Sequence, residues 1–431
     1  MTTREWVGSL VTCVAIGCGR TEPVVPRTAE AGAGSGRVAA KVADDVPPAR
    51  PVAPPPWSPE MQGVADGVNQ FALDLHRLRA TSGGNAFCSP FSLHAALAMT
   101  AVGARGTTLD ELRGPLRLPE ADGLVAAGDL ARHYGAGSPG CELSVASALW
   151  GQDGVAWKHD FLATLDERFN AGFRTADFAA DPERERQRIN ADVAEVTHGL
   201  IGSLVPPGTL TPLTRLCLTN AIYFKGSWLT TFDAEATSPQ PFHRPDGSAE
   251  PVLLMHRTGT EAHFAGDGFQ LLALPYVGGE LEMVVLLPAT ADGLDALEAR
   301  LDAAMLAEWR AAAGRVEVSI WLPRFRLRDS FNAVATLRTL GVAALFDTDR
   351  ADLSGMTEAE RLAVGAVIHE AFVDVNEEGT EAAAATAVIA NLPSPPPPRR
   401  VEFRADRPFL FLIRDARHGT ILFLGRCVAP H

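Results

Sequence analysis

The chain has 431 residues, of which 46 % are hydrophobic, and a net charge of −14 at pH 7. This size and composition indicate a globular protein with a large core, in one large domain or in two to three smaller ones. Residues 1–60 contain six basic and six acidic side chains, so the whole acidic excess lies in residues 61–431. An acidic domain argues against nucleic acid and heparin-like polyanions as partners.

The N-terminus combines a basic residue with a short apolar run. Arg4 is followed by an apolar run from Trp6 to Gly17 and then by Cys18. The run is too short to span a bilayer as a helix, but it has the length of an export signal. We therefore predict a signal peptide over residues 1–18, and the alternative is a wrongly assigned start codon.

The end of this run, Ala15-Ile-Gly-Cys18, resembles the cleavage box of a bacterial lipoprotein. In such a box the cysteine is acylated and becomes the first mature residue, so Cys18 is the predicted lipidation site. The chain is then expected outside the cytoplasm, in the periplasm or the extracellular space. A lipid on Cys18 would anchor it to the bacterial outer membrane.

Residues 19–62 are rich in Pro, Ala and Gly and lack hydrophobic periodicity, which predicts a disordered linker ahead of a domain at 63–431. The cysteines of that domain lie far apart in apolar contexts, and no CxxC pair exists, so we expect no metal site. Buried free thiols are the favoured interpretation, with a disulfide as the alternative in an oxidising compartment. These cysteines are Cys88, Cys141, Cys217 and Cys427.

Helical spacing of apolar residues from about Ala65 to Leu78 predicts the first helix of the domain. Residues 85–92 predict a short strand and then a helix that begins at Ser89-Pro90 and continues to Met99. A further helix is predicted at 160–169. Apolar or alternating runs predict strands at 143–150, 216–224, 281–288, 316–323, 409–413 and 420–425. Because helices and strands are mixed without a regular βαβ order, the predicted fold class is α+β.

The sequence contains no recognisable catalytic motif. It has no G-x-S-x-G elbow, no H-E-x-x-H pair, no phosphate-binding loop and no dinucleotide fingerprint. His369-Glu370 lacks a second histidine, which favours a structural role. We therefore predict that the chain is not an enzyme, needs no cofactor, and acts as a binding or inhibitory protein.

The stretch Glu377-Glu-Gly-Thr-Glu-Ala-Ala-Ala-Ala-Thr-Ala-Val388 is the least ordinary part of the chain. Its alanines favour a helix, whereas the glycine, the threonines and the prolines at 393–398 oppose a stable one. Small side chains also suit a segment that slides between two existing strands. Taken alone, the stretch leaves both interpretations open.

Five motifs, in this order along the chain, resemble the signatures of the serpin family of serine protease inhibitors. They are Asn220-Ala-Ile-Tyr-Phe-Lys-Gly-Ser-Trp228, Leu322-Pro-Arg-Phe325, Ala351-Asp-Leu-Ser-Gly-Met356, Asn376-Glu-Glu-Gly-Thr-Glu-Ala-Ala-Ala-Ala-Thr386 and Phe403-Arg-Ala-Asp-Arg-Pro-Phe-Leu-Phe411. The resemblance covers about residues 64–431. It implies a serpin fold with three β-sheets, eight to nine helices and an exposed reactive-centre loop before Phe403.

The resemblance implies a serine-type endopeptidase inhibitor that acts as a suicide substrate. A target serine protease, or a cysteine protease, would cut the loop, become trapped as a covalent acyl-enzyme, and be carried along as the loop inserts into the central sheet. The inhibitor is expected to act as a monomer. The alternative is a serpin-fold protein without inhibition, either a binding protein or a plain protease substrate.

The resemblance also implies which residues form the site. The hinge of the loop comprises Glu377, Glu378, Gly379, Thr380, Glu381, Ala382, Ala383, Ala384, Ala385 and Thr386. A polar cluster beneath the sheet, the shutter, comprises Ser89, Ser92, Asn220 and His369. The entrance to the sheet, the breach, comprises Trp228, Arg324 and Glu377, with a salt bridge expected between Arg324 and Glu377.

The reactive bond is predicted by counting along the loop. With Glu377 as the seventeenth residue before the cut, the bond is Pro393-Ser394, and proline before a cut suits few serine proteases. A loop shorter by two residues gives Asn391-Leu392, which is chemically easier, and one shorter by one residue gives Leu392-Pro393, which is worse. The nearest basic residue after the hinge is Arg399. We therefore expect a post-proline, elastase-like or asparagine-directed protease as the target, and not a trypsin-like one.

Overall fold

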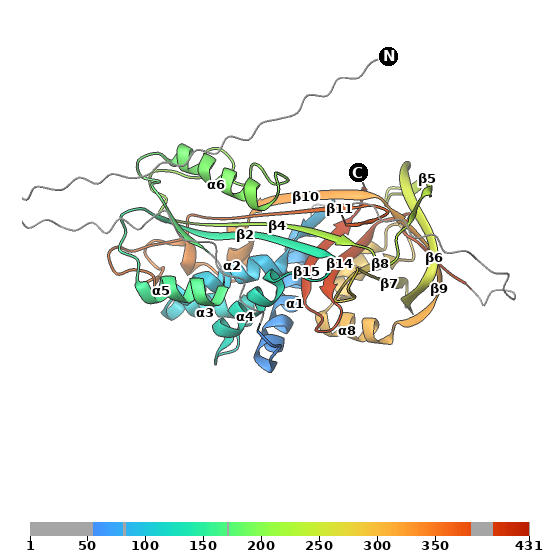
Figure 1. Cartoon of the computed structure of the whole chain (residues 1–431), viewed down its shortest axis with the longest axis horizontal. Helices are drawn as coiled ribbons and strands as arrows, with labels where there is room; N and C mark the ends of the chain where they lie inside the picture. The colour runs from blue at the N-terminus through green and yellow to red at the C-terminus, as the bar shows by residue number, and fades with distance from the viewer. Residues whose placement is uncertain (1–54, 81–82, 170–171, 381–399, 431) are drawn as a thin grey trace, which may run out of the picture. The chain divides into compact units, whose positions relative to one another are not determined.

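The structure is a computed structural model that describes residues 55–80, 83–169, 172–380 and 400–430 (Figure 1). The predicted signal peptide, the lipidation site Cys18 and nearly all of the predicted linker lie outside these residues. Hinge residues 381–386 and both candidate reactive bonds also lie outside them. The described residues belong to one unit of the chain, Ala49–His431.

Nine α-helices occur in the described residues. They are α1 (Pro59–Arg79), α2 (Pro90–Gly103), α3 (Gly106–Leu116), α4 (Gly123–Gly135), α5 (His159–Thr164), α6 (Pro182–Val196), α7 (Leu294–Arg300), α8 (Ala303–Ala312) and α9 (Val334–Thr339). The predicted first helix is confirmed but begins earlier, because Ser58 accepts the N–H of Met61 as the N-cap and Pro59 fills the first position. None of the described helices is both long enough and apolar enough to cross a membrane.

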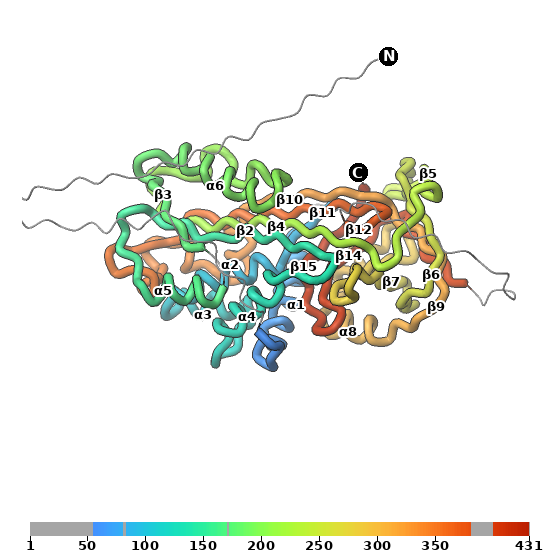
Figure 2. The backbone as a smooth tube through the Cα atoms, in the orientation of Figure 1, coloured from blue at the N-terminus to red at the C-terminus, as the bar shows by residue number. Residues whose placement is uncertain are grey.

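The central sheet has the strand order β10-β11-β12-β4-β2-β3. Its strands are β10 (Phe325–Asn332), β11 (Ala366–Val375), β12 (Gly379–Thr380), β4 (Leu216–Ser227), β2 (Cys141–Gln152) and β3 (Phe173–Ala176). Figure 2 shows β10, β11, β4 and β2 running together along the length of this sheet. As predicted, β4 is buried on both faces over most of its length.

The second sheet has the order β1-β15-β14-β8-β7-β6-β9-β13, and β5 pairs with β6 outside this path. Its strands are β1 (Ala86–Cys88), β15 (Ile421–Cys427), β14 (Phe409–Asp415), β8 (Leu281–Pro288), β7 (Phe269–Pro275), β6 (Ala249–Gly266), β9 (Gly314–Pro323), β13 (Val401–Arg404) and β5 (Asp233–His243). The α+β class is confirmed.

The described strands form two continuous sheets where three were expected. The reason is β6, a strand of 18 residues that takes part in two layers. It pairs with β7 through residues 262–266 and with β9 and β5 through residues 249–263. One long strand therefore joins the two sheets that would otherwise count separately.

The central sheet is covered on both faces. Helix α6 packs on one face, called here the outer face, where Ile189 and Val193 join a cluster with Tyr223 of β4 and Phe372 of β11. Helix α2 lies on the opposite, inner face together with the main core (Figure 1). Any strand added between β4 and β11 would thus lie between two packed layers.

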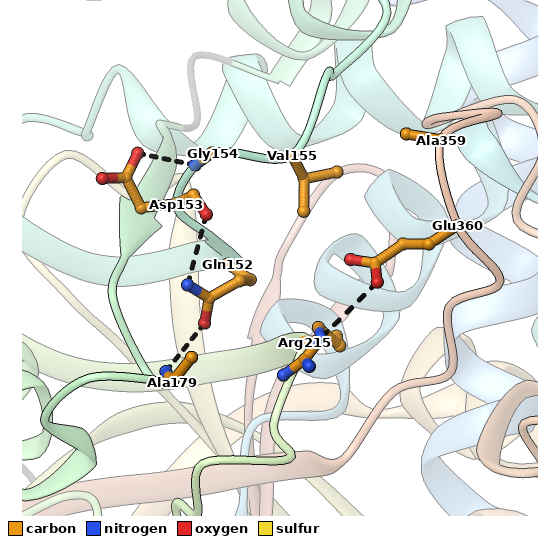
Figure 3. Close-up of a pocket in the computed structure, with 8 residues that line it drawn as sticks. All are labelled: Gln152, Asp153, Gly154, Val155, Ala179, Arg215, Ala359 and Glu360. Carbon is orange, nitrogen blue, oxygen red and sulfur yellow. Dashed lines mark hydrogen bonds and ion pairs between the residues drawn. The ribbon is translucent and has the colours of Figure 1, made fainter.

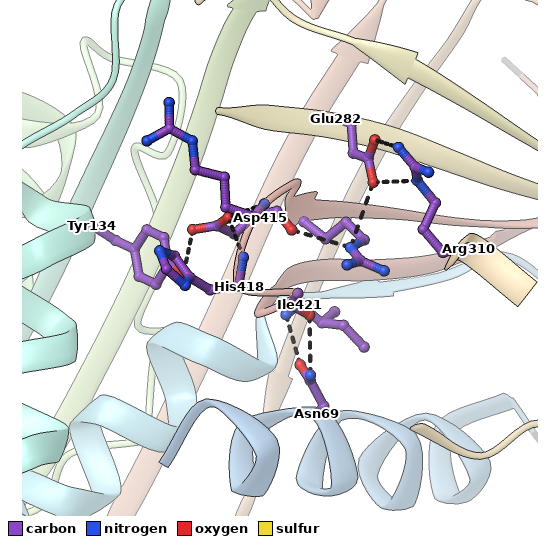
Figure 4. Close-up of polar contacts among 10 residues, drawn as sticks. Asn69, Tyr134, Glu282, Arg310, Asp415, His418 and Ile421 are labelled. Carbon is purple, nitrogen blue, oxygen red and sulfur yellow. Dashed lines mark hydrogen bonds and ion pairs between the residues drawn. The ribbon is translucent and has the colours of Figure 1, made fainter. Parts of the chain in front are cut away.

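The C-terminal hairpin of β14 and β15 is fixed to the first helices by polar side chains (Figure 4). The Asn69 amide accepts the N–H of Ile421 at 2.8 Å and donates to the carbonyl of Gly419 at 3.0 Å. Tyr134 donates its hydroxyl to Asp415 at 2.9 Å. Contacts of this kind join the two ends of the domain, which are far apart in sequence.

Candidate functional site

Gly379 and Thr380 of the hinge form the short strand β12, which lies at a fork between β11 and β4. Thr380 pairs with Val375 of β11 and with Gly226 of β4, antiparallel to both. Further along, β11 and β4 pair directly with each other, in parallel, from Ala366/Cys217 to Phe372/Tyr223. The central sheet is therefore open where the hinge enters and closed beyond that point.

Gly379 lies against the backbone of β4. A Cβ atom on this residue would come within 2.1 Å of the Gly226 carbonyl oxygen and 2.7 Å of the Ser227 Cα. Backbone atoms of a central strand cannot move away without loss of the sheet pairing. A glycine is thus required for the hinge to lie in the fork.

Thr380 is fully buried, and its hydroxyl lies 2.8 Å from the Tyr276 hydroxyl. The Tyr276 ring stacks on Trp228, with 4.7 Å between ring centroids and 9° between planes. Trp228 in turn donates its indole N–H to the Asn376 carbonyl at 3.0 Å. Burial raises the pKa of Tyr276 well above its ordinary value, so the hydroxyl stays neutral. An aromatic pair thus supports both the hinge strand and the turn before it.

Glu377 lies at the start of the hinge with its side chain buried. Both of its carboxylate oxygens accept from Arg324 Nε, at 2.6 and 2.7 Å, and Oε1 also accepts from the Thr237 hydroxyl at 2.5 Å. Burial alone would raise the pKa of Glu377, but the hydrogen bonds from Arg324 and Thr237 outweigh burial and lower it. Trp228, Arg324 and Glu377, which were predicted for the breach, lie together around the fork.

The four residues predicted for the shutter also lie together, all fully buried on the inner face. The Asn220 amide oxygen accepts from the Ser92 hydroxyl at 2.7 Å and from His369 Nδ1. Ser89 donates its backbone N–H to His369 Nε2 at 3.1 Å and its hydroxyl to the carbonyl of Leu422 at 2.7 Å. The cluster connects β4, β11, α2 and β15 directly below the closed part of the sheet.

These bonds require one form of His369. Nε2 accepts a backbone N–H and Nδ1 faces a carbonyl oxygen, so the neutral ring carries its proton on Nδ1. Burial and the nearby positive charge of Arg79 lower the pKa of His369 to about 3. The ring is therefore neutral at physiological pH.

Two residues of this site were not predicted, Thr237 and Tyr276. Tyr276 follows the end of β7 and Thr237 lies in β5, outside every motif that the sequence offered. Their roles depend on contacts across long sequence separations, between residues 276 and 380 and between 237 and 377. No local pattern signals such contacts.

A pocket of about 340 Å³ lies at the other end of β2, far along that strand from the fork (Figure 3). Its polar groups already bind one another, as Gln152 accepts from the Ala179 N–H at 3.0 Å and Arg215 lies 3.6 Å from Glu360. Within the described part of the chain, no group of three or more His, Cys, Asp or Glu side chains could hold a metal ion. The fork therefore remains the candidate site.

Comparison with known proteins identifies the family. The profile described as "Serpin (serine protease inhibitor)" matches residues 66–430. An uncharacterised serpin-like protein of Thermococcus kodakarensis is 37 % identical over 372 residues, which cover 85 % of this chain and 86 % of the relative. The leukocyte elastase inhibitor of Bos taurus is 38 % identical over 383 residues, which cover 86 % of this chain and all of the relative.

Solved structures agree with this assignment. Uncleaved ovalbumin has a TM-score of 0.78 and 27 % identity, covering 85 % of this chain and 100 % of ovalbumin. Human thyroxine-binding globulin, solved in complex with thyroxine, has a TM-score of 0.78 and 25 % identity, covering 86 % of this chain and 99 % of the globulin. The fold and the sequence lead to the same conclusion, which is that the chain belongs to the serpin family.

Proposed function

We propose that this serpin inhibits a serine endopeptidase as a suicide substrate, by inserting its cut loop between β4 and β11. The observation that carries the proposal is the fork, where Thr380 already pairs with both strands and Gly379 pairs with β4. Family membership and the similarity to leukocyte elastase inhibitors support it. Ovalbumin and thyroxine-binding globulin share the fold, and the second is named for binding thyroxine. The fold alone therefore does not establish inhibition, which needs a direct test.

The strand register at the fork determines which residues of β4 and β11 each inserted loop residue would pair with. Because Thr380 pairs antiparallel with Val375 and Gly226, each later residue would pair one position earlier in both strands. Residue 386 would then lie opposite both His369 and Asn220. Thr386 would separate these two shutter residues and present a small polar side chain to them, since strand partners in one row face the same side.

Insertion is expected to release free energy. One parallel contact between β4 and β11 would be replaced by two antiparallel contacts, which adds on the order of ten hydrogen bonds. At about 0.5–1.5 kcal/mol net for each bond, the gain is on the order of 10 kcal/mol. That is comparable to the stability of a protease domain, about 5–15 kcal/mol. The gain is therefore large enough to distort a protease attached to the loop.

The covalent step is ordinary acyl transfer. The protease serine Oγ attacks the carbonyl carbon before the cut, the C–N bond breaks, and the new amine leaves with a proton on the C-terminal fragment. The loop is then joined to the protease as an ester. Inhibition results if insertion is faster than attack of water on that ester.

The amino-acid composition of the loop limits the class of protease that could cut it. Between residues 381 and 398 the chain has no Lys or Arg. A protease that requires a basic residue before the cut therefore has no site ahead of Arg399. We propose an elastase-like, post-proline or asparagine-directed protease that cuts Pro393-Ser394 or Asn391-Leu392.

The test is incubation of the full chain with a panel of serine and cysteine proteases. We expect an SDS-stable complex with at least one serine protease, a gain in Tm after cleavage, and a C-terminal fragment whose mass identifies the bond. The variant Thr380→Arg forces a charge into a fully buried position, so it should be cleaved without forming the complex. Cleavage of the wild type without a complex and without a gain in Tm would overturn the proposal in favour of a plain substrate or binding protein.

We also propose that the chain is exported and anchored to a membrane by a lipid on Cys18. The support is the sequence around Cys18 and the linker that follows it. Expression of the full chain in a bacterium should place it in the membrane fraction, and Cys18→Ser should release it into the soluble fraction. Equal fractionation of the two forms would contradict the anchor.

A further inference from the structure

A cation lies beside the shutter at the end of α1. It is Arg79, the last residue of that helix, and its side chain is largely buried, with 16 % exposed. The guanidinium carbon lies 3.3 Å from the centre of the Phe331 ring, and Nη2 donates to the Asp329 carboxylate at 2.6 Å. Nε is buried and has no hydrogen-bond partner among the described residues. Hydrogen bonds alone therefore do not account for the position of this cation.

The Phe331 ring connects the cation to the shutter. Phe331 of β10 is the strand partner of His369 of β11, so both side chains face the inner side of the sheet. Their rings meet edge to face, with 5.2 Å between centroids and 61° between planes. Asp329 also accepts the backbone N–H of Phe87 at 3.1 Å, which fixes the carboxylate to β1. The guanidinium, the phenyl ring and the imidazole thus form a continuous contact from α1 to the shutter.

Few of the groups around the His369 ring can carry a charge. On α2, β4 and β15 the described groups are hydroxyls, an amide and a carbonyl, which do not titrate; they belong to Ser89, Ser92, Asn220 and Leu422. Strand β1, which packs against β11, brings the Cys88 thiol near Arg79 and Asp329. Burial raises the pKa of Cys88 to about 12, so this thiol is neutral. The charged groups are therefore Arg79 on α1 and Asp329 on β10.

A second proton on His369 would break the shutter at one atom. Nε2 accepts the backbone N–H of Ser89, while Nδ1 donates to Asn220. A proton on Nε2 would place two donors opposite each other, so β11 would lose its bond to the start of α2. A nearby positive charge opposes this protonation. Arg79 accordingly adds to the effect of burial in lowering the pKa of His369.

We propose that Arg79 is the positioning residue of the shutter, because it holds Phe331 against His369 and keeps a positive charge beside the imidazole, so that the shutter stays closed in acid. This role does not depend on inhibition of a protease. It gives the end of α1, which lies outside all five sequence motifs, a part in the control of the central sheet.

The test follows proton binding to His369 by NMR of the full chain with isotope-labelled histidine, between pH 7.5 and pH 4. The variant His369→Asn identifies the resonance. Arg79→Gln removes the charge and keeps a donor for Asp329, Arg79→Met removes both, and Arg79→Lys keeps the charge. Arg77→Met is the matched control, because Arg77 lies on the same helix and pairs with Asp74.

We expect Arg79→Gln to raise the proton affinity of His369 about tenfold, which moves its titration up by about one pH unit. Arg79→Lys and Arg77→Met should titrate like wild type. Arg79→Gln should also speed hydrogen exchange at the Ser89 amide at pH 5 and not at pH 7.5. The Ser92 amide is the internal reference for this exchange, because it donates to the Ser89 hydroxyl and not to the histidine.

The neutral variants decide the proposal. Titration of His369 at the wild-type pH in both Arg79→Gln and Arg79→Met would overturn it, and lower stability with that unchanged titration would leave Arg79 a packing role only. A shift in Arg79→Met that disappears when Asp329→Asn is added would also overturn it, because the shift would then come from the unpaired carboxylate. If Arg79→Met does not fold, the comparison of Arg79→Gln with Arg79→Lys gives the same decision.

Discussion

His369 gives the shutter a defined response to pH. The histidine pKa is about 6.5 in an unfolded chain and about 3 in the folded protein. Below pH 6.5 the unfolded state binds a proton that the folded state excludes. The stabilisation by neutral His369 is therefore complete above pH 6.5 and falls by about 1.4 kcal/mol per pH unit on acidification toward pH 3.

The first prediction follows from this loss of stability on acidification. His369→Asn should destabilise the protein most at pH 7 and above, and the difference in free energy of unfolding from wild type should shrink between pH 6.5 and pH 5. Urea denaturation at several pH values measures it. Because the carboxylates titrate equally in both proteins, they cancel in the difference. A difference that stays constant with pH would show that His369 is not held neutral.

The second prediction concerns Tyr276. Tyr276→Phe keeps the ring stacked on Trp228 but removes the hydroxyl that binds Thr380. Loss of this hydrogen bond should cost about 1 kcal/mol and speed hydrogen exchange at the Thr380 amide by about fivefold. Tyr134→Phe is the control, since its hydroxyl binds Asp415 instead. It should lower stability and leave exchange at Thr380 relative to its neighbours unchanged.

At the scale of elements, the position of the hinge strand depends on the absence of a side chain at Gly379. Gly379→Ala would place its Cβ within 2.1 Å of the Gly226 carbonyl, so β12 should leave the fork. We expect the variant to be cleaved by the target protease at the normal rate but to trap several-fold less of it, as measured by the SDS-stable complex. Gly314→Ala is the matched control, because a Cβ there meets no atom within 4 Å. Equal trapping by both variants would refute this role of Gly379.

The helices and strands that could be predicted are those whose apolar residues recur with one clear period. The strands predicted at 143–150 and 216–224 appear as β2 and β4, each slightly longer than expected. Strand β6 escaped prediction because a proline, two glycines and charged residues interrupt its alternation, while pairing on both sides still holds it extended. Helix 160–169 is present as α5 followed by a π-helical turn, Leu165–Phe169.

The site residues that could be predicted from the sequence are those that lie within the five motifs. Arg324 and Glu377 were expected to pair, and the structure places them 2.6 Å apart. The depth at which the hinge lies in the sheet was not predictable, because it depends on how β4 and β11 diverge after Tyr223 and Phe372. That divergence is a property of the whole sheet, not of the hinge sequence.

At the scale of the molecule, the core protects its thiols. All four cysteines of the described residues are free. Burial raises the pKa of Cys88, Cys141 and Cys217 to about 12 and raises that of Cys427 as well. The structure describes these four residues as free thiols, and three of them, Cys88, Cys217 and Cys427, are buried.

The fourth prediction is therefore slow thiol chemistry. At pH 8 a thiol reagent such as an aromatic disulfide should label the native domain far more slowly than the same protein in denaturant, because so little thiolate is present. Cys141 should react first, since it is the one of the four that is only partly buried. Rapid labelling of Cys88 or Cys427 in native protein would show that the core opens more readily than its packing implies.

If the loop inserts as proposed, the strand register at the fork also determines where a protease attached to the loop would end. Strand β11 runs from Val375 back to Ala366, nine steps or about 30 Å at the usual strand rise. A loop that follows it would deliver its cut end beside Arg215, which precedes β4 and lines the pocket at the far end of β2. A captured protease would be carried from one pole of the domain to the other, so labels at Arg215 and on the protease should approach each other only after cleavage.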